Sequence, residues 1–413
     1  MHAPILEVHL AWHPGDRAAA RLAAELDHHF HHGVYGSLLG GTMEFYQRSA
    51  PWSAPGSAPR PIAWPDAALP PGHPPPAQAI AVVLFLGDEL MRACQPAGSD
   101  WLRWVREAVE SAARRPDQVA LLPVALDPLD PRSALATALP PLQCLGATDP
   151  LAESSAAAGP PPVAVLRRDL SQALARWLHP AGGPALRVFI SHTKRMSGPD
   201  EAVASLVDTV REVLGGTRIG SFYDAQDLQP GADWDQALRR HAASSALLAL
   251  RTDLYASREW CQREVLTAKR HGMPVVVLDA LQRGEARGSF LMDHVPRLPV
   301  RRGADGAWDR AAIGQALDLL ADAWLHSVLW QRQAERAAAD PMLAGYQFLP
   351  QAPEPSTLSQ LLARVPPGAE LRVLHPDPPL ACEERAVLQD LVRRAGHAGL
   401  DLSTPKLLAA RGA

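Results

Sequence analysis

The chain has 413 residues, which is too long for one small α/β domain and is typical of two or three domains. Its 40 basic and 44 acidic side chains nearly balance, so the composition does not indicate a nucleic-acid-binding surface. No apolar run approaches the roughly 20 residues of a membrane span, the N-terminus lacks a signal-peptide pattern, and the four cysteines have neither disulfide nor metal spacing. We therefore expect a reduced, cytoplasmic protein with no metal, no membrane contact and no direct contact with nucleic acid.

The first part of the chain alternates strands and helices. Residues 4–12 are typical of a buried strand, and a helix is expected to run from Asp16 to the histidine cluster that ends at His32. Residues 50–76 hold ten prolines, which favours a long surface loop. Two more buried strands are expected at 79–86 and 119–126, with a helix between them. This order predicts a parallel sheet.

The rest of the chain divides by composition. Residues 148–185 are rich in Ala, Pro and Gly around one short helix, which favours a linker. Residues 186–336 form the next predicted domain, which ends in a long amphipathic helix. Residues 337–413 have too little apolar content for a large core and are expected to be a small C-terminal appendage.

Polar residues follow the buried strands of the second domain. Apolar runs at 186–190, 245–250 and 274–278 alternate with helical segments, which predicts a parallel sheet that is covered on both faces. Ligands bind such sheets beyond the carboxyl ends of the strands. The helix expected after Ser257 carries Glu264, and Gly272 ends it. Trp260 lies four residues before Glu264, so an indole is expected beside a partly desolvated carboxylate. The alternative is a solvated glutamate on the helix surface.

Three motifs in this order resemble a bacterial Toll/interleukin-1 receptor (TIR) domain of the NAD⁺-cleaving antiphage-defence type. They are Val188–His192, the Phe222-Tyr223-Asp224 run with Asp227, Pro230 and Gly231, and Ser257–Cys261 followed by Glu264. The resemblance covers about 150 of the 413 residues. It implies a flavodoxin-like parallel sheet, and it implies that Glu264 is the catalytic carboxylate for cleavage of the nicotinamide–ribose bond.

The resemblance also assigns the other candidate site residues. It implies that the substrate is bound by residues at the strand ends and beside Glu264, namely Ser191, His192, Lys194, Phe222, Tyr223 and Trp260. Adjacent residues of a strand point to opposite sides, so a catalytic Ser191–His192 pair is disfavoured. The family's loop for TIR–TIR assembly implies a contact role for Asp224, Asp227, Pro230 and Gly231.

Residues 1–147 repeat the order of the second domain. Gly87-Asp88 and a helix with Glu107 occupy the places of Thr252-Asp253 and the helix with Glu264. We therefore expect two TIR-type domains in tandem. The first strand of the earlier copy ends in Ala11-Trp12-His13, and prolines replace the acidic loop, so that copy is expected to be degenerate.

The resulting hypothesis is an assembly-activated NAD⁺ glycohydrolase that depletes NAD⁺ in antiphage immunity. NAD⁺ would be its substrate and not a resident cofactor, because the chain has neither GxGxxG nor a Walker loop. The expected partners are other TIR domains and a trigger-sensing protein or nucleotide-bound partner. Two alternatives stay open: a non-catalytic scaffold that signals through TIR–TIR contacts, and a cyclase that makes a cyclic ADP-ribose-type signal.

Overall fold

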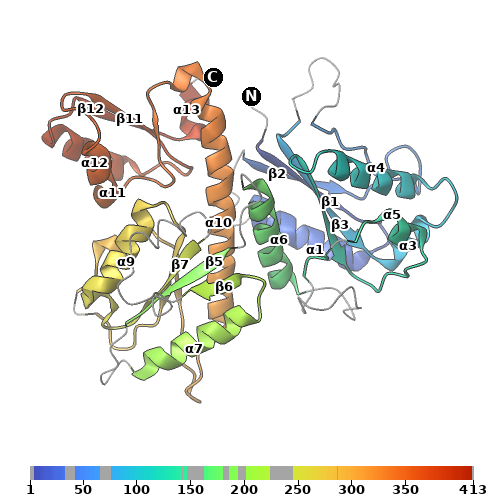
Figure 1. Cartoon of the computed structure of the whole chain (residues 1–413), viewed down its shortest axis with the longest axis horizontal. Coiled ribbons are helices and arrows are strands. Elements are labelled where there is room, and N and C mark those ends of the chain that lie inside the picture. Colours follow the sequence, from blue (N-terminus) through green and yellow to red (C-terminus); the bar gives the residue numbers. More distant parts are fainter. Residues whose placement is uncertain are drawn as a thin grey trace. The chain divides into compact units, whose positions relative to one another are not determined.

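The chain folds into two compact units, Met1–Leu178 and His179–Ala413, each built on parallel β-sheets (Figure 1). The computed structural model describes residues 4–32, 42–65, 76–141, 143–146, 162–179, 186–193, 201–223, 245–285 and 287–411. The predicted mixed α/β class with parallel sheets is confirmed in both units. Within the described residues, no helix has the length and apolarity needed to cross a membrane.

The first unit contains a four-stranded sheet in the order β2-β1-β3-β4. All eight residues of β3 are buried, as expected for a central parallel strand that is covered on both faces. The strands are β1 (Leu6–Ala11), β2 (Met43–Arg48), β3 (Ala79–Leu86) and β4 (Val119–Ala125). The helices before residue 140 are α1 (Arg17–Asp27), the π-helical turn η1 (His28–His32), α3 (Asp88–Ala93), α4 (Asp100–Arg114) and α5 (Ala134–Ala138).

The described part of the proline-rich segment is not only a surface loop. Ile62 and Trp64 are buried in the same core as Trp104 on α4. The indole Nε1 of Trp64 donates a hydrogen bond of 2.9 Å to Oε1 of Glu107. Apolar side chains between the prolines explain the difference from the expected loop, because they bury area without needing a regular backbone.

Helix α6 (Val163–Leu178) lies within the first unit, although its composition favoured a linker. Leu166, Leu170 and Leu174 form one apolar stripe and are fully buried. The helix contacts α1, and the Asp169 carboxylate accepts a hydrogen bond of 2.9 Å from the backbone N–H of Gly146. Leucine recurs every four residues in this segment, which favours an amphipathic helix despite the Ala and Pro content around it.

The second unit begins with a five-stranded parallel sheet in the order β6-β5-β7-β8-β9. The strands are β5 (Arg187–Ser191), β6 (Gly220–Tyr223), β7 (Ser245–Arg251), β8 (Val275–Asp279) and β9 (Arg297–Pro299). This is the flavodoxin-like order expected from the sequence. The chain leaves β5 toward β6 and then returns to the other side of β5, so the strand order reverses between β5 and β7. Ligands of such sheets bind at this switch point.

Helices cover both faces of this sheet (Figure 1). On one face lie η4 (Tyr255–Ser257), α9 (Glu259–Arg270) and η5 (Phe290–Met292), with Val265 and Ala268 of α9 packed on Leu247 and Val277. On the other face, α10 (Arg310–Ala338) contacts β7, β8 and α7 (Glu201–Gly215). Helix α9 begins after Arg258 and not directly after Ser257, and the Ser257 hydroxyl donates to the carbonyl of Leu254 instead of capping the helix.

Residues 347–411, called here the C-terminal module, form a small parallel α/β layer with its own core. Its sheet has the order β10-β11-β12, and eight buried residues of its helices and strands, including Leu358, Val373, Val392 and Leu402, form the core. The elements are β10 (Gln347–Phe348), α11 (Pro355–Leu362), β11 (Glu370–Leu374), α12 (Cys382–Arg394), β12 (Gly399–Ser403) and α13 (Pro405–Arg411). The short turn η6 (Pro341–Leu343) precedes it.

The packing of α6 predicts the effect of shortening Leu170. The Leu170→Ala variant should lower the free energy of unfolding of the first unit by about 2–5 kcal/mol, because it leaves a cavity at a fully buried position. The exposed Arg176→Ala variant on the same helix is the control and should change it by less than about 0.5 kcal/mol. The measurement is a urea titration in which hydrogen exchange is followed at peptides of β1 and β3, so that unfolding of the first unit is distinguished from unfolding of the second. Equal, negligible effects of both changes would mean that α6 is a linker after all.

Candidate functional site

Three buried side chains from three elements meet at the switch point of the second unit. Ser191 is the last residue of β5, Tyr255 lies in the turn that follows β7, and Glu264 lies on α9. The Ser191 hydroxyl donates a hydrogen bond to Oε2 of Glu264. The Tyr255 hydroxyl lies 2.5 Å from the same Ser191 oxygen. With Ser191 donating to the carboxylate, Tyr255 is the donor to Ser191, so the three groups form a directed chain from Tyr255 to Glu264.

All three residues of this hydrogen-bond chain are buried. Only 3% of the surface of Glu264 is exposed, and Ser191 and Tyr255 are each 1% exposed. The alternative of a solvated surface glutamate is therefore wrong. A carboxylate that leaves water needs hydrogen-bond donors, and the Ser191 hydroxyl supplies one.

The protonation state of Tyr255 follows from the same burial. Desolvation raises the pKa of the Tyr255 phenol well above its ordinary value of 10.0, and the nearby Cys261 and Glu264 add to the shift. Tyr255 therefore stays protonated at neutral pH and remains a donor toward Ser191.

Helix α9 holds Glu264 in place through the face that it packs on the sheet. Cys261, Val265 and Ala268 follow the helical repeat and are buried against the strands. The Cys261 thiol lies 3.6 Å from the backbone carbonyl oxygen of His192, just beyond β5. The segment that carries the carboxylate is thus attached to the strand that carries its hydrogen-bond donor.

Two buried hydroxyls at the same edge have no hydrogen-bond partner among the residues that the structure describes. They are Oγ1 of Thr193, which follows β5, and Oγ1 of Thr252, which follows β7. Both residues are buried. An unsatisfied buried hydroxyl costs free energy and is most often found where a ligand or ordered water completes it.

The other residues expected at the site are placed differently. The His192 ring Nδ1 lies 3.1 Å from the Thr193 carbonyl oxygen, whereas the Ser191 hydroxyl bonds Glu264 and Tyr255. Trp260 is 40% exposed, and the Arg263 guanidinium lies 5.6 Å from the centre of its ring. The aromatic group in the hydrogen-bond chain is therefore Tyr255, on the turn before α9.

The remaining expected residues cannot be placed by their side chains. Phe222 and Tyr223 belong to the backbone of β6, and their side chains are outside the described part of the chain. Lys194 and the expected assembly loop also lie outside the described residues, namely Asp224, Asp227, Pro230 and Gly231. Their roles stay predictions.

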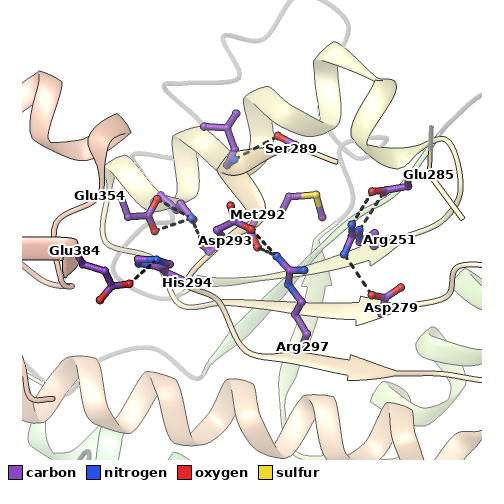
Figure 2. Close-up of polar contacts among 12 residues, drawn as sticks. Arg251, Asp279, Glu285, Ser289, Met292, Asp293, His294, Arg297, Glu354 and Glu384 are labelled. Carbon is purple, nitrogen blue, oxygen red and sulfur yellow. Dashed lines mark hydrogen bonds and ion pairs between the residues drawn. The ribbon is translucent and has the colours of Figure 1, made fainter. Parts of the chain in front are cut away.

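Sequence reasoning missed Tyr255 and the ion pairs that fix the neighbouring strand ends. Arg251, the last residue of β7, forms two bonds with Glu285, at 2.6 and 3.0 Å, and a third of 3.3 Å with Asp279 at the end of β8 (Figure 2). The bond to Glu285 is the main cause that raises the pKa of Arg251. An arginine at a strand end within a polar loop was the available signal. The pairing fixes the loop after β8 beside the switch point.

The described residues contain no group of three or more His, Cys, Asp or Glu side chains placed to hold a metal ion.

Comparison with known proteins identifies the domain that contains this site. The family model described as "TIR domain" matches residues 188–312, which include Ser191, Tyr255 and Glu264. No curated protein and no solved structure matches the chain.

Burial of Tyr255 predicts a pH dependence of stability. An acid whose pKa is higher in the folded chain stabilises the fold fully below its unfolded pKa, and this contribution is lost as the pH rises toward the folded value. The free energy of unfolding of the wild type should therefore fall by up to ~1.4 kcal/mol per pH unit above about pH 10, and Tyr255→Phe should lack this loss. Urea titrations of both proteins at several alkaline pH values test it. Parallel curves would show that Tyr255 ionises normally.

Proposed function

We propose, on the premise that residues 188–312 are a TIR domain, that the chain is an NAD⁺ glycohydrolase whose catalytic carboxylate is Glu264. TIR domains can have NAD⁺-cleaving activity. The observation that carries the proposal is the position of Glu264, buried and hydrogen-bonded to Ser191 at the β5/β7 switch point. The unsatisfied hydroxyls of Thr193 and Thr252 at the same edge support a ligand there.

A carboxylate suits the chemistry of this bond. Cleavage breaks the bond between C1′ of the ribose and the nicotinamide nitrogen, and the electron pair leaves with nicotinamide. The ribose passes through an oxocarbenium-like state whose positive charge a nearby carboxylate stabilises. Water then attacks C1′ and releases a proton, which gives ADP-ribose. The pyridinium ring is neutralised as it departs, so no strong general acid is required.

The buried state of Glu264 favours control by assembly. A carboxylate that is 3% exposed cannot lie against a ribose until α9 or its surroundings shift. TIR domains commonly self-associate, and such contacts are the proposed cause of the shift. An enzyme of this kind would remain silent as a single chain and deplete NAD⁺ once assembled, as an antiphage effector would. A cyclase would share the site and differ in the nucleophile that captures C1′.

The first unit is proposed to be a degenerate copy of the TIR-type fold. Its strand order β2-β1-β3-β4 follows the same pattern as β6-β5-β7-β8. The last residue of β1 is Ala11, so the position that Ser191 occupies in β5 carries no hydroxyl. Glu107 accepts a hydrogen bond from the Trp64 indole in the packing around α4. These features support a structural or regulatory role.

Replacement of Glu264 by glutamine tests the catalytic role. The variant keeps the shape of the side chain but removes the charge that would stabilise the oxocarbenium ion, so NAD⁺ cleavage should fall by at least about a hundredfold. Glu259→Gln is the matched control, since Glu259 is exposed in the first turn of the same helix and should leave cleavage unchanged. The assay is release of nicotinamide by the full chain at high protein concentration with a crowding agent.

The outcomes separate the candidate functions. Cleavage that is equal in Glu264→Gln and wild type would exclude this site. Absence of cleavage in every condition, together with intact self-association, would favour the scaffold. The chromatographic position of the product distinguishes ADP-ribose from a cyclic isomer.

Control by assembly predicts a steep dependence on protein concentration. Because Glu264 is buried in the single chain, the activity per molecule should rise as the concentration rises. Initial rates of nicotinamide release across a dilution series measure this, with the oligomeric state followed by light scattering. Activity per molecule that is constant across the series would contradict the assembly requirement.

A further inference from the structure

The C-terminal module contacts the helix that carries Glu264. Pro350 lies where a Cβ on Gly272 would stand, within 2.5 Å, and Gly272 has the positive φ of +67° that ends α9. The Gln351 side chain donates a hydrogen bond of 3.2 Å to the carbonyl of Met273. These contacts place the start of the module directly against the end of α9.

The centre of this contact is a buried ion pair between Lys269 and Glu354. The Lys269 side chain is 1% exposed and the Glu354 side chain 10%. The ammonium donates to both carboxylate oxygens of Glu354, at 2.7 and 2.9 Å, and to the carbonyl of Asp293, at 2.6 Å (Figure 2). The three N–H donors of a lysine are thus matched by three acceptors.

The choice of lysine fits this geometry. Lysine occurs at only three positions of the chain, 194, 269 and 406, among 40 basic residues. The three donors of an ammonium share one nitrogen and can meet three acceptors that converge on it, whereas the donors of a guanidinium are spread over a planar fork. Burial lowers the pKa of Lys269, and its hydrogen bond to Glu354 opposes that shift. The charge of Lys269 is therefore kept in the buried site by a residue of the C-terminal module.

A second polar contact joins the C-terminal module to the loop after η5, and it differs from the first in its exposure. His294 and Glu384 lie 3.3 Å apart, and their side chains are 44% and 43% exposed (Figure 2). An exposed pair contributes little to the free energy of folding, whereas removing one partner of a buried pair leaves an unpaired buried charge and is strongly destabilising. Lys269–Glu354 is therefore the pair on which the docking of the module depends.

Helix α9 is consequently held at two points. Lys269 is five residues beyond Glu264, about 7.5 Å along the helix. Glu264 is joined to Ser191 on β5, and Lys269 is joined to Glu354 on the module. A shift of α9 by one or two ångströms, of the size seen in switching helices, would have to break the second attachment before it could uncover the carboxylate.

We propose that the C-terminal module is an autoinhibitory latch, in which Glu354 holds Lys269 and thereby keeps Glu264 buried against Ser191. This inference rests on the proposed function for its effect on NAD⁺ cleavage. The coupling between the module and α9 is independent of that function. Release of the module would free the end of α9 and let the carboxylate reach a ribose.

Cys261 supplies a readout that does not depend on catalysis. It lies on α9 three residues before Glu264 and is buried, whereas Cys382 is exposed and Cys94 is buried in the first unit. In the full-length Glu354→Gln protein, a thiol reagent should modify Cys261 about ten to a hundred times faster than in the wild type, because the buried ammonium loses its counter-charge. Peptide mass spectrometry follows each cysteine. Cys94 should stay protected, which shows that the first unit is folded.

Two further variants separate the latch from general unfolding. Glu384→Gln removes the exposed pair of the same interface and should change Cys261 modification by less than about twofold. The double variant Lys269→Met with Glu354→Leu replaces the ion pair by an apolar pair and should return Cys261 to nearly wild-type protection. Fast modification in this double variant as well would mean that the interface fails to fold, and would overturn the charge-based latch.

Cleavage of NAD⁺ by the same proteins tests the autoinhibition. At a concentration where the wild type is silent, Glu354→Gln should release nicotinamide, and adding Glu264→Gln should abolish that release. Unchanged Cys261 modification in Glu354→Gln overturns the latch. Faster Cys261 modification would overturn the inhibitory role if the variant then cleaves NAD⁺ no faster than the wild type at a concentration where the wild type is active. If no variant cleaves NAD⁺ at any concentration, the proposed function and the inhibitory effect both fall, and Cys261 modification still decides the coupling.

Discussion

The second unit depends on one constraint, which is that a buried carboxylate must have hydrogen-bond donors. Glu264 obtains a donor only because β5 ends beside β7 and α9 returns across the strands from the end of β7. That arrangement needs the strand order to reverse between β5 and β7, which places the end of the first strand next to the turn after the third. Tyr255 on that turn then fixes the direction of the Ser191 hydroxyl. The hydrogen-bond chain of the site thus depends on the strand order of the sheet.

The same reasoning applies to the opposite end of α9. Lys269 lies in the last turn, where a positive charge is favoured by the helix dipole, but burial requires acceptors as well. These acceptors come from a loop after η5 and from Glu354, which is 85 residues away in the chain. One helix therefore carries a buried carboxyl group and a buried amine, each completed by a different part of the second unit. A change at either group is expected to be felt at the other, because the helix between them is short and stiff.

The sequence predicts the local elements of this site well and its partners poorly. Uninterrupted apolar runs were sufficient for β3, β7 and β8, and Gly272 marked the end of α9. Tyr255 was missed because it lies in a short 3-10 turn that has no periodic pattern. Lys269 resembled an ordinary last-turn cation, since nothing local distinguishes a solvated lysine from one whose partner is distant in the chain. The low apolar content of residues 337–413 predicted no large core, and the C-terminal module has a small one, formed by its strands with α11 and α12.

The two units differ in the residue that ends their first strand. Both place the end of their first strand between the second and third strands in space. At that place one unit has the methyl group of Ala11 and the other the hydroxyl of Ser191. Without a donor there, a carboxylate on the covering helix would be costly to bury. Glu107 on α4 is exposed and accepts a hydrogen bond from the Trp64 indole. The two glutamates therefore differ in their surroundings, because Glu264 is buried beside a hydroxyl donor and Glu107 is exposed on its helix.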